Sequence, residues 1–411
     1  MGVSGLGVSP IWIVRVPPRD APRYAVGPVQ TDLNADGFAD TATDDYPASP
    51  RARLIYGAAG GLSSASSVGA PSLAGGEPCS PGDLDGDGMS DLLFMRSTPI
   101  DVYWGRRSDL LTNAESIVLP AGVAFLDLAS AGDANRDGRA DVLAAHYPSR
   151  TLYLLLADSS GRVALGGQVT LPAGLTAPGV PPDGAGDFDA DGFPDVVVTS
   201  RGGEDNFCRV YLGGLDGLNA ARYIELGDSV PAGWLLHGDA RSVGDVNGDG
   251  FFDVACAAVS TTGMSTHCVY YGNAGRSSEL RTCLNTFGRS SFATGGDLNR
   301  DGFSDVALMV GDGTNPISIF WGDEAGVSAA PSQAITFPAT AGAAWRARIA
   351  DFNGDSVPDL FASSTSNDRI YVQNTGTGFP RSPTVRWTAG EGRISEVAIA
   401  PAGAITRRRA K

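Results

Sequence analysis

A nine-residue, aspartate-rich motif recurs seven times along this 411-residue chain, at intervals of 50 to 58 residues. Asp occupies positions 1, 5 and 9 of every copy, and position 3 is Asp or Asn. A fixed period of this length indicates a repeat architecture, in which each unit buries its apolar surface against its neighbours. We number the copies loops 1 to 7; in order, they span residues 32–40, 83–91, 133–141, 187–195, 245–253, 297–305 and 351–359.

Four short strands are predicted in each repeat. A buried apolar run follows each loop directly, as "LLFM" follows Asp91, and a second strand carries an aromatic residue and usually a glycine, as in "VYWG" from Val102. A third strand is typified by "QVTLP" from Gln168, and a fourth precedes the next loop, as in "SFATGGD" ending at Asp297. The third and seventh repeats, with "LYLLL" and "IYVQN", keep the aromatic residue but lose the glycine.

These units predict an all-β protein, a seven-bladed β-propeller of four-stranded antiparallel blades, because radial stacking covers both faces of sheets that cannot bury them alone. We expect the whole chain, residues 1–411, to form this single domain. Partial repeats at 1–21 and 391–411 are expected to take part in ring closure, and the alternative is eight blades, the eighth composed of both chain ends. The full repeats span approximately 22–75, 76–122, 123–177, 178–235, 236–289, 290–341 and 342–390.

The loops carry the ligand set of a calcium site. Oxygen ligands at alternate positions of a sharply turning loop can converge on one cation, and Gly at position 6 lets the backbone turn so that the position-7 carbonyl also points inward. Magnesium prefers a stricter octahedron, and transition metals favour His or Cys, which these loops lack. An EF-hand is excluded because position 12 holds no Glu in any copy. Asp-Gly loops also make good turns without metal, but turn chemistry does not require three fixed carboxylates in seven copies.

We therefore predict about seven calcium ions, with loop 7 the weakest site because Ser356 replaces glycine at position 6. Seven divalent cations would change the formal net charge from −16 to −2, and so relieve repulsion among the clustered carboxylates. The predicted ligands are positions 1, 3, 5, 7 and 9 of each loop: Asp32, Asn34, Asp36, Phe38 and Asp40; Asp83, Asp85, Asp87, Met89 and Asp91; Asp133, Asn135, Asp137, Arg139 and Asp141; Asp187, Asp189, Asp191, Phe193 and Asp195; Asp245, Asn247, Asp249, Phe251 and Asp253; Asp297, Asn299, Asp301, Phe303 and Asp305; and Asp351, Asn353, Asp355, Val357 and Asp359.

The combination of "GDxNxDGxxD" with a downstream aromatic strand ending in glycine resembles the FG-GAP family, also met as VCBS-type repeats, over nearly the whole chain. That family forms the calcium-binding β-propeller of the integrin α-subunit head and of many secreted bacterial proteins. The resemblance implies that each calcium loop joins the first two strands of a blade, on the face opposite the usual ligand-binding face. It also implies that the loop aspartates are scaffold ligands and not catalytic groups.

Composition limits the class of partner. The 46 acidic residues outnumber the 30 basic ones, which argues against nucleic acid as a partner. No run approaches the roughly 20 apolar residues of a membrane helix, so no membrane insertion is expected. The start, "MGVSGLGVSP", lacks the features of a signal peptide. We expect a monomer, or part of a larger secreted chain, located outside the cell or at its surface.

Five cysteines occur without the short spacings of a zinc site, and their odd number leaves at least one thiol unpaired within the chain. Cys256 and Cys268 are expected on adjacent strands of one hairpin. They are expected either to form a disulfide or to remain two buried free thiols.

No convergent catalytic set is identifiable. His146, His237 and His267 are expected to be structural, and no G-x-S-x-G nucleophile motif occurs. We therefore expect a non-catalytic adhesion or ligand-binding module whose ligand is an unknown protein or glycan. The second hypothesis is a calcium-stabilised, lyase-like enzyme that acts on polysaccharides. The candidate ligand-binding residues, on loops expected opposite the calcium sites, are Tyr46, Tyr147, Trp234 and Trp345.

Overall fold

The seven repeats fold into a series of separate antiparallel sheets. The computed structural model of the chain describes residues 32–44, 52–56, 67–70, 77–95, 100–107, 114–117, 127–146, 149–160, 162–171, 183–199, 207–215, 217–226, 234–260, 264–287, 290–310, 317–335, 344–351, 353, 355, 357–364, 369–372, 374 and 385–387. Within these residues every element is a strand, and no helix is long and apolar enough to cross a membrane.

The described strands form one three-stranded sheet and six four-stranded sheets, in each of which the spatial order follows the chain order. Sheet 1 contains β1 (Thr41–Asp44), β2 (Ala52–Ile55) and β3 (Ser67–Ala70). Sheet 2 contains β4 (Glu77–Gly82), β5 (Asp91–Met95), β6 (Ile100–Tyr103) and β7 (Ala114–Ile117). Sheet 3 contains β8 (Asp127–Gly132), β9 (Asp141–His146), β10 (Thr151–Ala157) and β11 (Val163–Thr170).

The remaining sheets follow the same plan. Sheet 4 contains β12 (Asp183–Gly186), β13 (Asp195–Thr199), β14 (Cys208–Tyr211) and β15 (Tyr223–Glu225). Sheet 5 contains β16 (Trp234–Gly244), β17 (Asp253–Ser260), β18 (Met264–Tyr270) and β19 (Arg281–Phe287). Sheet 6 contains β20 (Ser290–Gly296), β21 (Asp305–Val310), β22 (Ile317–Phe320) and β23 (Gln333–Ile335). Sheet 7 contains β24 (Ala344–Ala350), β25 (Asp359–Ser364), β26 (Arg369–Val372) and β27 (Val385–Trp387).

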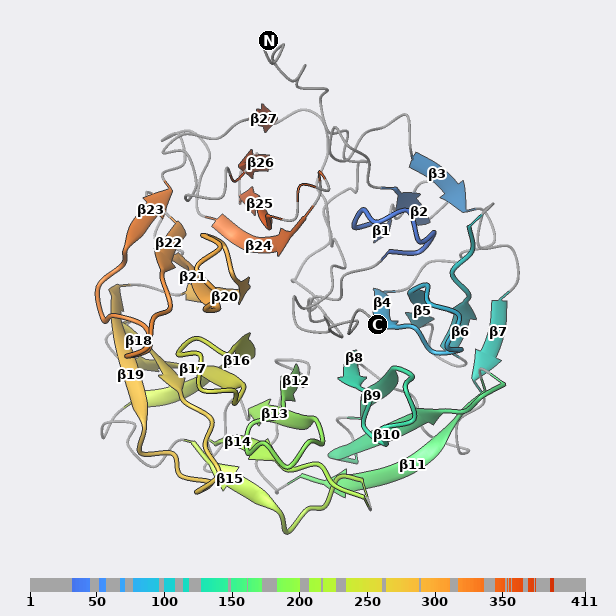
Figure 1. Cartoon of the computed structure of the whole chain (residues 1–411), viewed down its shortest axis with the longest axis horizontal. Helices are drawn as coiled ribbons and strands as arrows, with labels where there is room; N and C mark the ends of the chain where they lie inside the picture. Colours follow the sequence, from blue (N-terminus) through green and yellow to red (C-terminus); the bar gives the residue numbers. More distant parts are fainter. Residues whose placement is uncertain are drawn as a thin grey trace, which may run out of the picture.

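The sheets are arranged around a common centre (Figure 1). The first strand of each four-stranded sheet lies nearest the centre, and the fourth lies at the perimeter (Figure 1). In sheet 1 the strand expected before loop 1 falls outside the described residues. Strand β16 begins at Trp234, two residues before the start expected for its repeat at 236.

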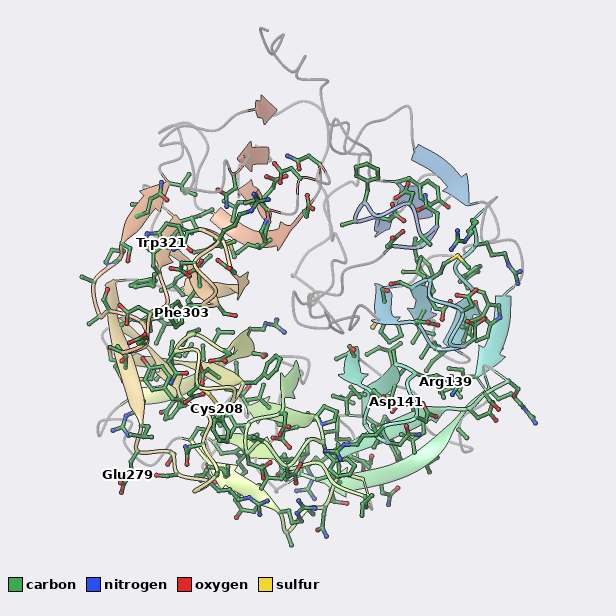
Figure 2. All side chains as sticks on the ribbon, viewed as in Figure 1. Arg139, Asp141, Cys208, Glu279, Phe303 and Trp321 are labelled. Carbon is green, nitrogen blue, oxygen red and sulfur yellow. A yellow bond between two sulfur atoms is a disulfide. The ribbon has the colours of Figure 1, made fainter. Side chains whose placement is uncertain are left out.

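Neighbouring sheets cover each other's faces. Residues 141–145 of β9 are all buried, so side chains on both faces of this strand are shielded from water. The outermost strand of the same sheet, β11, is mostly exposed. Side chains fill the spaces between sheets around the ring (Figure 2), and one apolar cluster joins Val142 and Leu154 of sheet 3 to Val196 of sheet 4. Burial on both faces explains why the strands that follow the loops are continuous apolar runs and do not alternate.

The cysteines pair differently from the sequence-based expectation. Cys256 and Cys268 are direct cross-strand partners on β17 and β18, as the hairpin predicted, but they do not bond to each other. Disulfides instead join Cys208 to Cys256 and Cys268 to Cys283. Both alternatives considered for Cys256 and Cys268 were therefore wrong. The reason is tertiary: Cys208 and Cys256, 48 residues apart, meet in the apolar cluster between sheets 4 and 5. Cys79 is a buried free thiol, so the expected unpaired cysteine is confirmed.

Candidate functional site

In the six four-stranded sheets, each acidic loop joins the first strand to the second. Loop 2 starts directly after β4 and ends at Asp91, the first residue of β5. At the end of β4, the register shifts and Gly82 pairs with Asp91 at a φ of 120°. This left-handed conformation suits glycine, and it turns the chain from the strand into the loop. Positions 1 and 9 of the motif are thus brought to the same end of one strand pair.

Within the loop, the side chains at positions 1, 3 and 5 accept hydrogen bonds from backbone N–H groups. In loop 2, the Asp87 N–H donates to Oδ1 of Asp83 and to Oδ1 of Asp85, each at 3.1 Å. The Gly88 N–H donates to Oδ2 of Asp83 at 2.7 Å, and the Met89 N–H to Oδ1 of Asp87 at 2.9 Å. Loops 1, 3, 5 and 6 repeat this pattern, and the described parts of loops 4 and 7 repeat most of it. The loop backbone therefore folds around its own acidic side chains.

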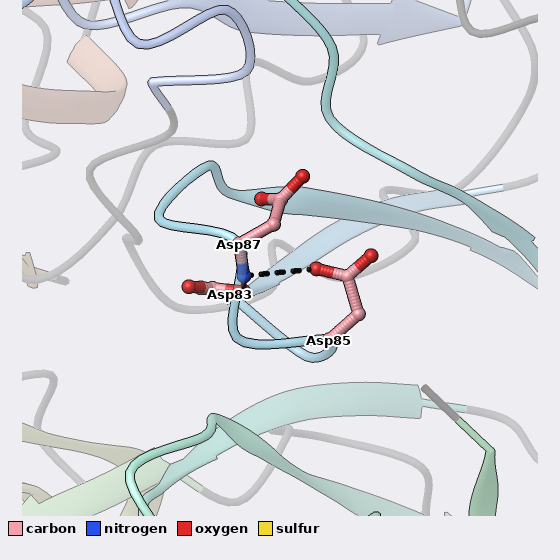
Figure 3. Close-up of side chains that lie close together, drawn as sticks. All are labelled: Asp83, Asp85 and Asp87. Carbon is pink, nitrogen blue, oxygen red and sulfur yellow. Dashed lines mark hydrogen bonds between the residues drawn. The ribbon is translucent and has the colours of Figure 1, made fainter. Parts of the chain in front are cut away.

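The carboxylates of Asp83, Asp85 and Asp87 converge in loop 2, as Figure 3 shows. One oxygen from each of the three lies within 4.8 Å of the others, so the three could hold a metal ion. In loop 4 the converging set is Asp187, Asp189 and Asp195. These two loops are the ones with Asp at position 3. Oxygen-only sites of this kind suit a hard cation, so the residues present fit calcium.

The loops with Asn at position 3 are organised differently. In loop 1, the Asn34 side-chain amide donates from Nδ2 to Oδ2 of Asp36 at 2.9 Å. The same bond occurs in loops 3, 5, 6 and 7 at 2.8 to 3.3 Å. A neutral amide at position 3 thus reduces both the charge of the cluster and the number of free carboxylate oxygens. Loops 2 and 4 carry the greater need for a counter-ion, because each concentrates four aspartates.

The aspartate at position 9 lies beneath the loop and is fully buried. Oδ2 of Asp91 accepts the Leu84 N–H at 2.7 Å, and Oδ1 accepts the Gly105 N–H at 2.8 Å. Burial raises the pKa of Asp91 to about 8, although the two backbone donors act in the opposite direction. Equivalent pairs of bonds hold the position-9 aspartates of loops 3, 4, 5 and 6. This carboxylate therefore fastens the loop to the end of the sheet's third strand.

Sequence reasoning missed the role of the glycine in the "VYWG" strand. A Cβ at Gly105 would lie 2.4 Å from the carbonyl oxygen of Ser90 and 3.0 Å from that of Leu33, in the preceding loop. The glycine lets the chain pass close enough for its N–H to reach Asp91. Where the sequence loses this glycine, Ala157 and Asn374 donate the equivalent N–H groups, to Asp141 and Asp359. The sequence did carry a signal for this contact, because the glycine and the position-9 aspartate recur together in most repeats.

We predict that Gly105→Ala destabilises the protein by roughly 3 kcal/mol, because neither backbone carbonyl near the new methyl group can move without disturbing a loop. The measurement is the free energy of unfolding in denaturant. Ala157→Gly is the matched control, since it changes the equivalent position in the other direction and should cost less than about 1 kcal/mol. Equal losses in the two variants would contradict the steric role.

Successive loops are also bonded to one another. The Ala140 N–H of loop 3 donates to the carbonyl oxygen of Asp83 in loop 2 at 2.7 Å, and the Ser304 N–H of loop 6 donates to that of Asp245 in loop 5 at 2.8 Å. Position 8 pairs in this way with position 1 of the preceding loop in loops 2, 3, 5 and 6, whereas position 8 of loops 4 and 7 is a proline (Pro194 and Pro358), which has no N–H to donate. These bonds join loops 1 to 3 in one series and loops 4 to 6 in another, so the order of one loop depends on its neighbours within the series.

The remaining predicted residues are less fully described. In loop 7, the Asp355 N–H donates to Oδ1 of Asp351 at 3.1 Å, but Ser356, the basis for expecting a weak site, lies outside the described residues. Tyr46 and Tyr147 also lie outside them, and Trp234 and Trp345 belong to β16 and β24 but their side chains are not described. Among the described residues the structure brings together three of the predicted metal ligands in loop 2 and three in loop 4, and it does not bear on the predicted ligand-binding aromatics.

Comparison with known families gives the repeats their identity. The FG-GAP-like repeat family matches residues 83–144, 133–198 and 297–362. The chain contains FG-GAP repeats. No curated protein sequence matches the chain. Each matched segment runs from one acidic loop, through the remaining three strands of that sheet and the first strand of the next, to the following loop and the start of the strand after it.

Solved structures share the fold of this chain at low sequence identity. The lectin BP39L from Burkholderia pseudomallei has a TM-score of 0.60 and 16% identity, and the match covers 87% of this chain and 98% of the lectin. A protein from Lactobacillus plantarum has a TM-score of 0.51 and 12% identity, and the match covers 88% of this chain and 98% of that one. At these identities the likeness shows the fold alone. The fold is an all-β, propeller-like arrangement of antiparallel sheets.

Proposed function

We propose that this protein is a calcium-loaded, seven-bladed β-propeller that binds a protein or glycan ligand and performs no catalysis. The observation that carries the calcium assignment is the convergence of the Asp83, Asp85 and Asp87 carboxylates within 4.8 Å. Three clustered negative charges repel one another in a loop unless a cation lies among them. Calcium supplies two positive charges and accepts the irregular oxygen geometry of such a loop.

A second observation supports a cation in loop 4. Oδ1 of Asp187 is buried and has no hydrogen-bond partner among the described residues. Burial, followed by the neighbouring charges of Asp189 and Asp191, raises the pKa of Asp187. A buried carboxylate oxygen without a partner is costly, and a bound cation would satisfy it. By the repeat pattern, we extend the assignment to positions 1, 3, 5, 7 and 9 of all seven loops.

The seven sheets of the described strands support the proposal of seven blades. The two disulfides support an extracellular location, because disulfides persist in oxidising compartments. The ligand surface is proposed on the face opposite the acidic loops, which leaves the calcium sites as scaffold. Glycans are included as a ligand class because one protein of similar fold is a lectin.

The ligand proposal is tested by a binding screen. The full chain, immobilised on a support in a calcium-containing buffer, is expected to retain at least one glycan or protein. It should lose this ligand when a chelator removes calcium. Soluble polysaccharides incubated with the protein should show no new reducing or unsaturated ends. Product formation would contradict the non-catalytic assignment, and retention that is indifferent to calcium would contradict the role of the metal in supporting the binding surface.

A further inference from the structure

The two loops that concentrate four aspartates, loops 2 and 4, differ in the cations that surround them. Arg139 lies beside Gly86 of loop 2 and the charge of Arg106 acts on Asp85, but the described residues include no ion pair to Asp83, Asp85 or Asp87. In loop 4, by contrast, Nη2 of Arg276 lies 2.7 Å from Oδ2 of Asp189. The Asp189 side chain is only 1% exposed, so this ion pair neutralises a buried carboxylate.

Further arginine contacts surround loop 4. Nη2 of Arg276 lies 3.8 Å from Oδ2 of Asp191, and Nη2 of Arg222 lies 3.4 Å from the same oxygen. Arg136, from loop 3, donates to the backbone carbonyls of Asp191 and Gly192 at 2.6 and 2.5 Å. Asp191 is correspondingly absent from the converging carboxylate set of loop 4, whereas its counterpart in loop 2 belongs to the set. The position-5 carboxylate of loop 4 thus lies against two arginines and outside the set.

Arg276 lies in a turn of residues 273–277, between β18 and β19 of sheet 5, that contacts loop 4. The Asn273 N–H donates to the carbonyl oxygen of Phe188 in loop 4 at 3.0 Å, so the turn rests directly on the loop. The Asn273 side chain closes the turn, donating to the Ser277 carbonyl at 2.9 Å and accepting the Ser277 N–H at 3.0 Å. Arg276 itself has a φ of 53° within this turn. The backbone that carries Arg276 is therefore fixed against loop 4, and the ion pairs with Asp189 and Asp191 position its guanidinium.

We propose that Arg276 is a resident counter-ion of loop 4 that competes with calcium and lowers the calcium affinity of this loop below that of loop 2. This inference rests on the proposed calcium function of the loops. A fixed positive charge beside Asp189 repels an incoming divalent cation and occupies one oxygen that the cation needs. At the same time, it neutralises the buried carboxylate when calcium is absent, so loop 4 keeps its structure in both conditions.

The test compares Arg276→Gln with wild type by calorimetric calcium titration and by melting the full chain in calcium and in chelator. Arg276→Gln is expected to raise the calcium affinity of one site by roughly tenfold, because a competing positive charge is removed. In chelator it should melt below wild type, and calcium should remove most of that difference. An unchanged isotherm would overturn the proposal, as would a variant that fails to fold even in calcium.

Two further variants test whether the gain in calcium affinity comes from the charge of Arg276 and from loop 4. Arg276→Lys keeps the positive charge, and its calcium affinity should stay near that of wild type. In the double variant D187N/R276Q the gained affinity should be lost, because Asp187 belongs to the converging set of loop 4. Persistence of the gain in the double variant would place it in another loop and refute the proposal. If wild type binds no calcium, the proposed function itself fails; if D83N removes a site and R276Q gains nothing, only the role of Arg276 fails.

Discussion

Removal of calcium by a chelator is expected to lower the melting temperature of the full chain by roughly 20 °C or more. Each loop with calcium at about 100 times its dissociation constant would contribute roughly 2.7 kcal/mol to stability. Several such sites together equal or exceed the whole stability of a typical domain, about 5–15 kcal/mol. Loops 1 to 3, and likewise loops 4 to 6, are bonded to one another through position 8 and position 1, so loss of order in one loop should spread within its series. Scanning calorimetry in calcium and in chelator measures the shift.

The specificity of this effect is checked with magnesium, which should restore only part of the lost stability because these loops do not offer an octahedral cage. Calorimetric titration of the calcium-free protein should give about seven sites. A count below four, or a melting temperature indifferent to chelator, would refute the calcium assignment. Neither result would change the observed sheets or their order, which do not depend on the calcium assignment.

Asp91→Ala is expected to destabilise the protein by about 4 kcal/mol, because it leaves the buried N–H groups of Leu84 and Gly105 without acceptors at roughly 1–3 kcal/mol each. The side chain it removes is fully buried, so water does not readily replace the lost partners. The measurement is the free energy of unfolding in denaturant, in chelator as well as in calcium. A loss that persists in chelator would show that Asp91 stabilises the loop independently of metal.

Asp87→Asn is the matched control for Asp91→Ala. Asp87 is exposed and belongs to the converging carboxylates of loop 2, but it does not bond the base of the loop to the sheet. Its substitution should therefore weaken calcium binding at loop 2 and have little effect on stability in chelator. If both variants lost stability only in calcium, Asp91 would act purely as a metal ligand, and its structural role would be rejected.

The acidic loops show which features of the fold and of the site could be predicted from the sequence. Their period, the apolar run after Asp91 and the aromatic strand at Val102 predicted the four strands of each repeat, because period and alternation are local properties of the chain. The alternating aspartates likewise predicted that Asp83, Asp85 and Asp87 would meet, since a turning loop of fixed spacing brings them together. The "VYWG" glycine was visible in the sequence, but the reason for it was not, because the carbonyls it avoids, those of Ser90 and Leu33, are brought to it only by the folding of loops 2 and 1.

The sequence by itself determined the repeat unit, the all-β class and the positions of the acidic loops, because these depend on residues that are neighbours along the chain. Only the tertiary structure decided which distant groups meet. It joined Cys208 to Cys256 across two sheets and placed Arg276 against Asp189 of the preceding sheet's loop. Such contacts depend on how each sheet stacks on the next, and an arginine 87 residues from its partner carries no local signal of that approach.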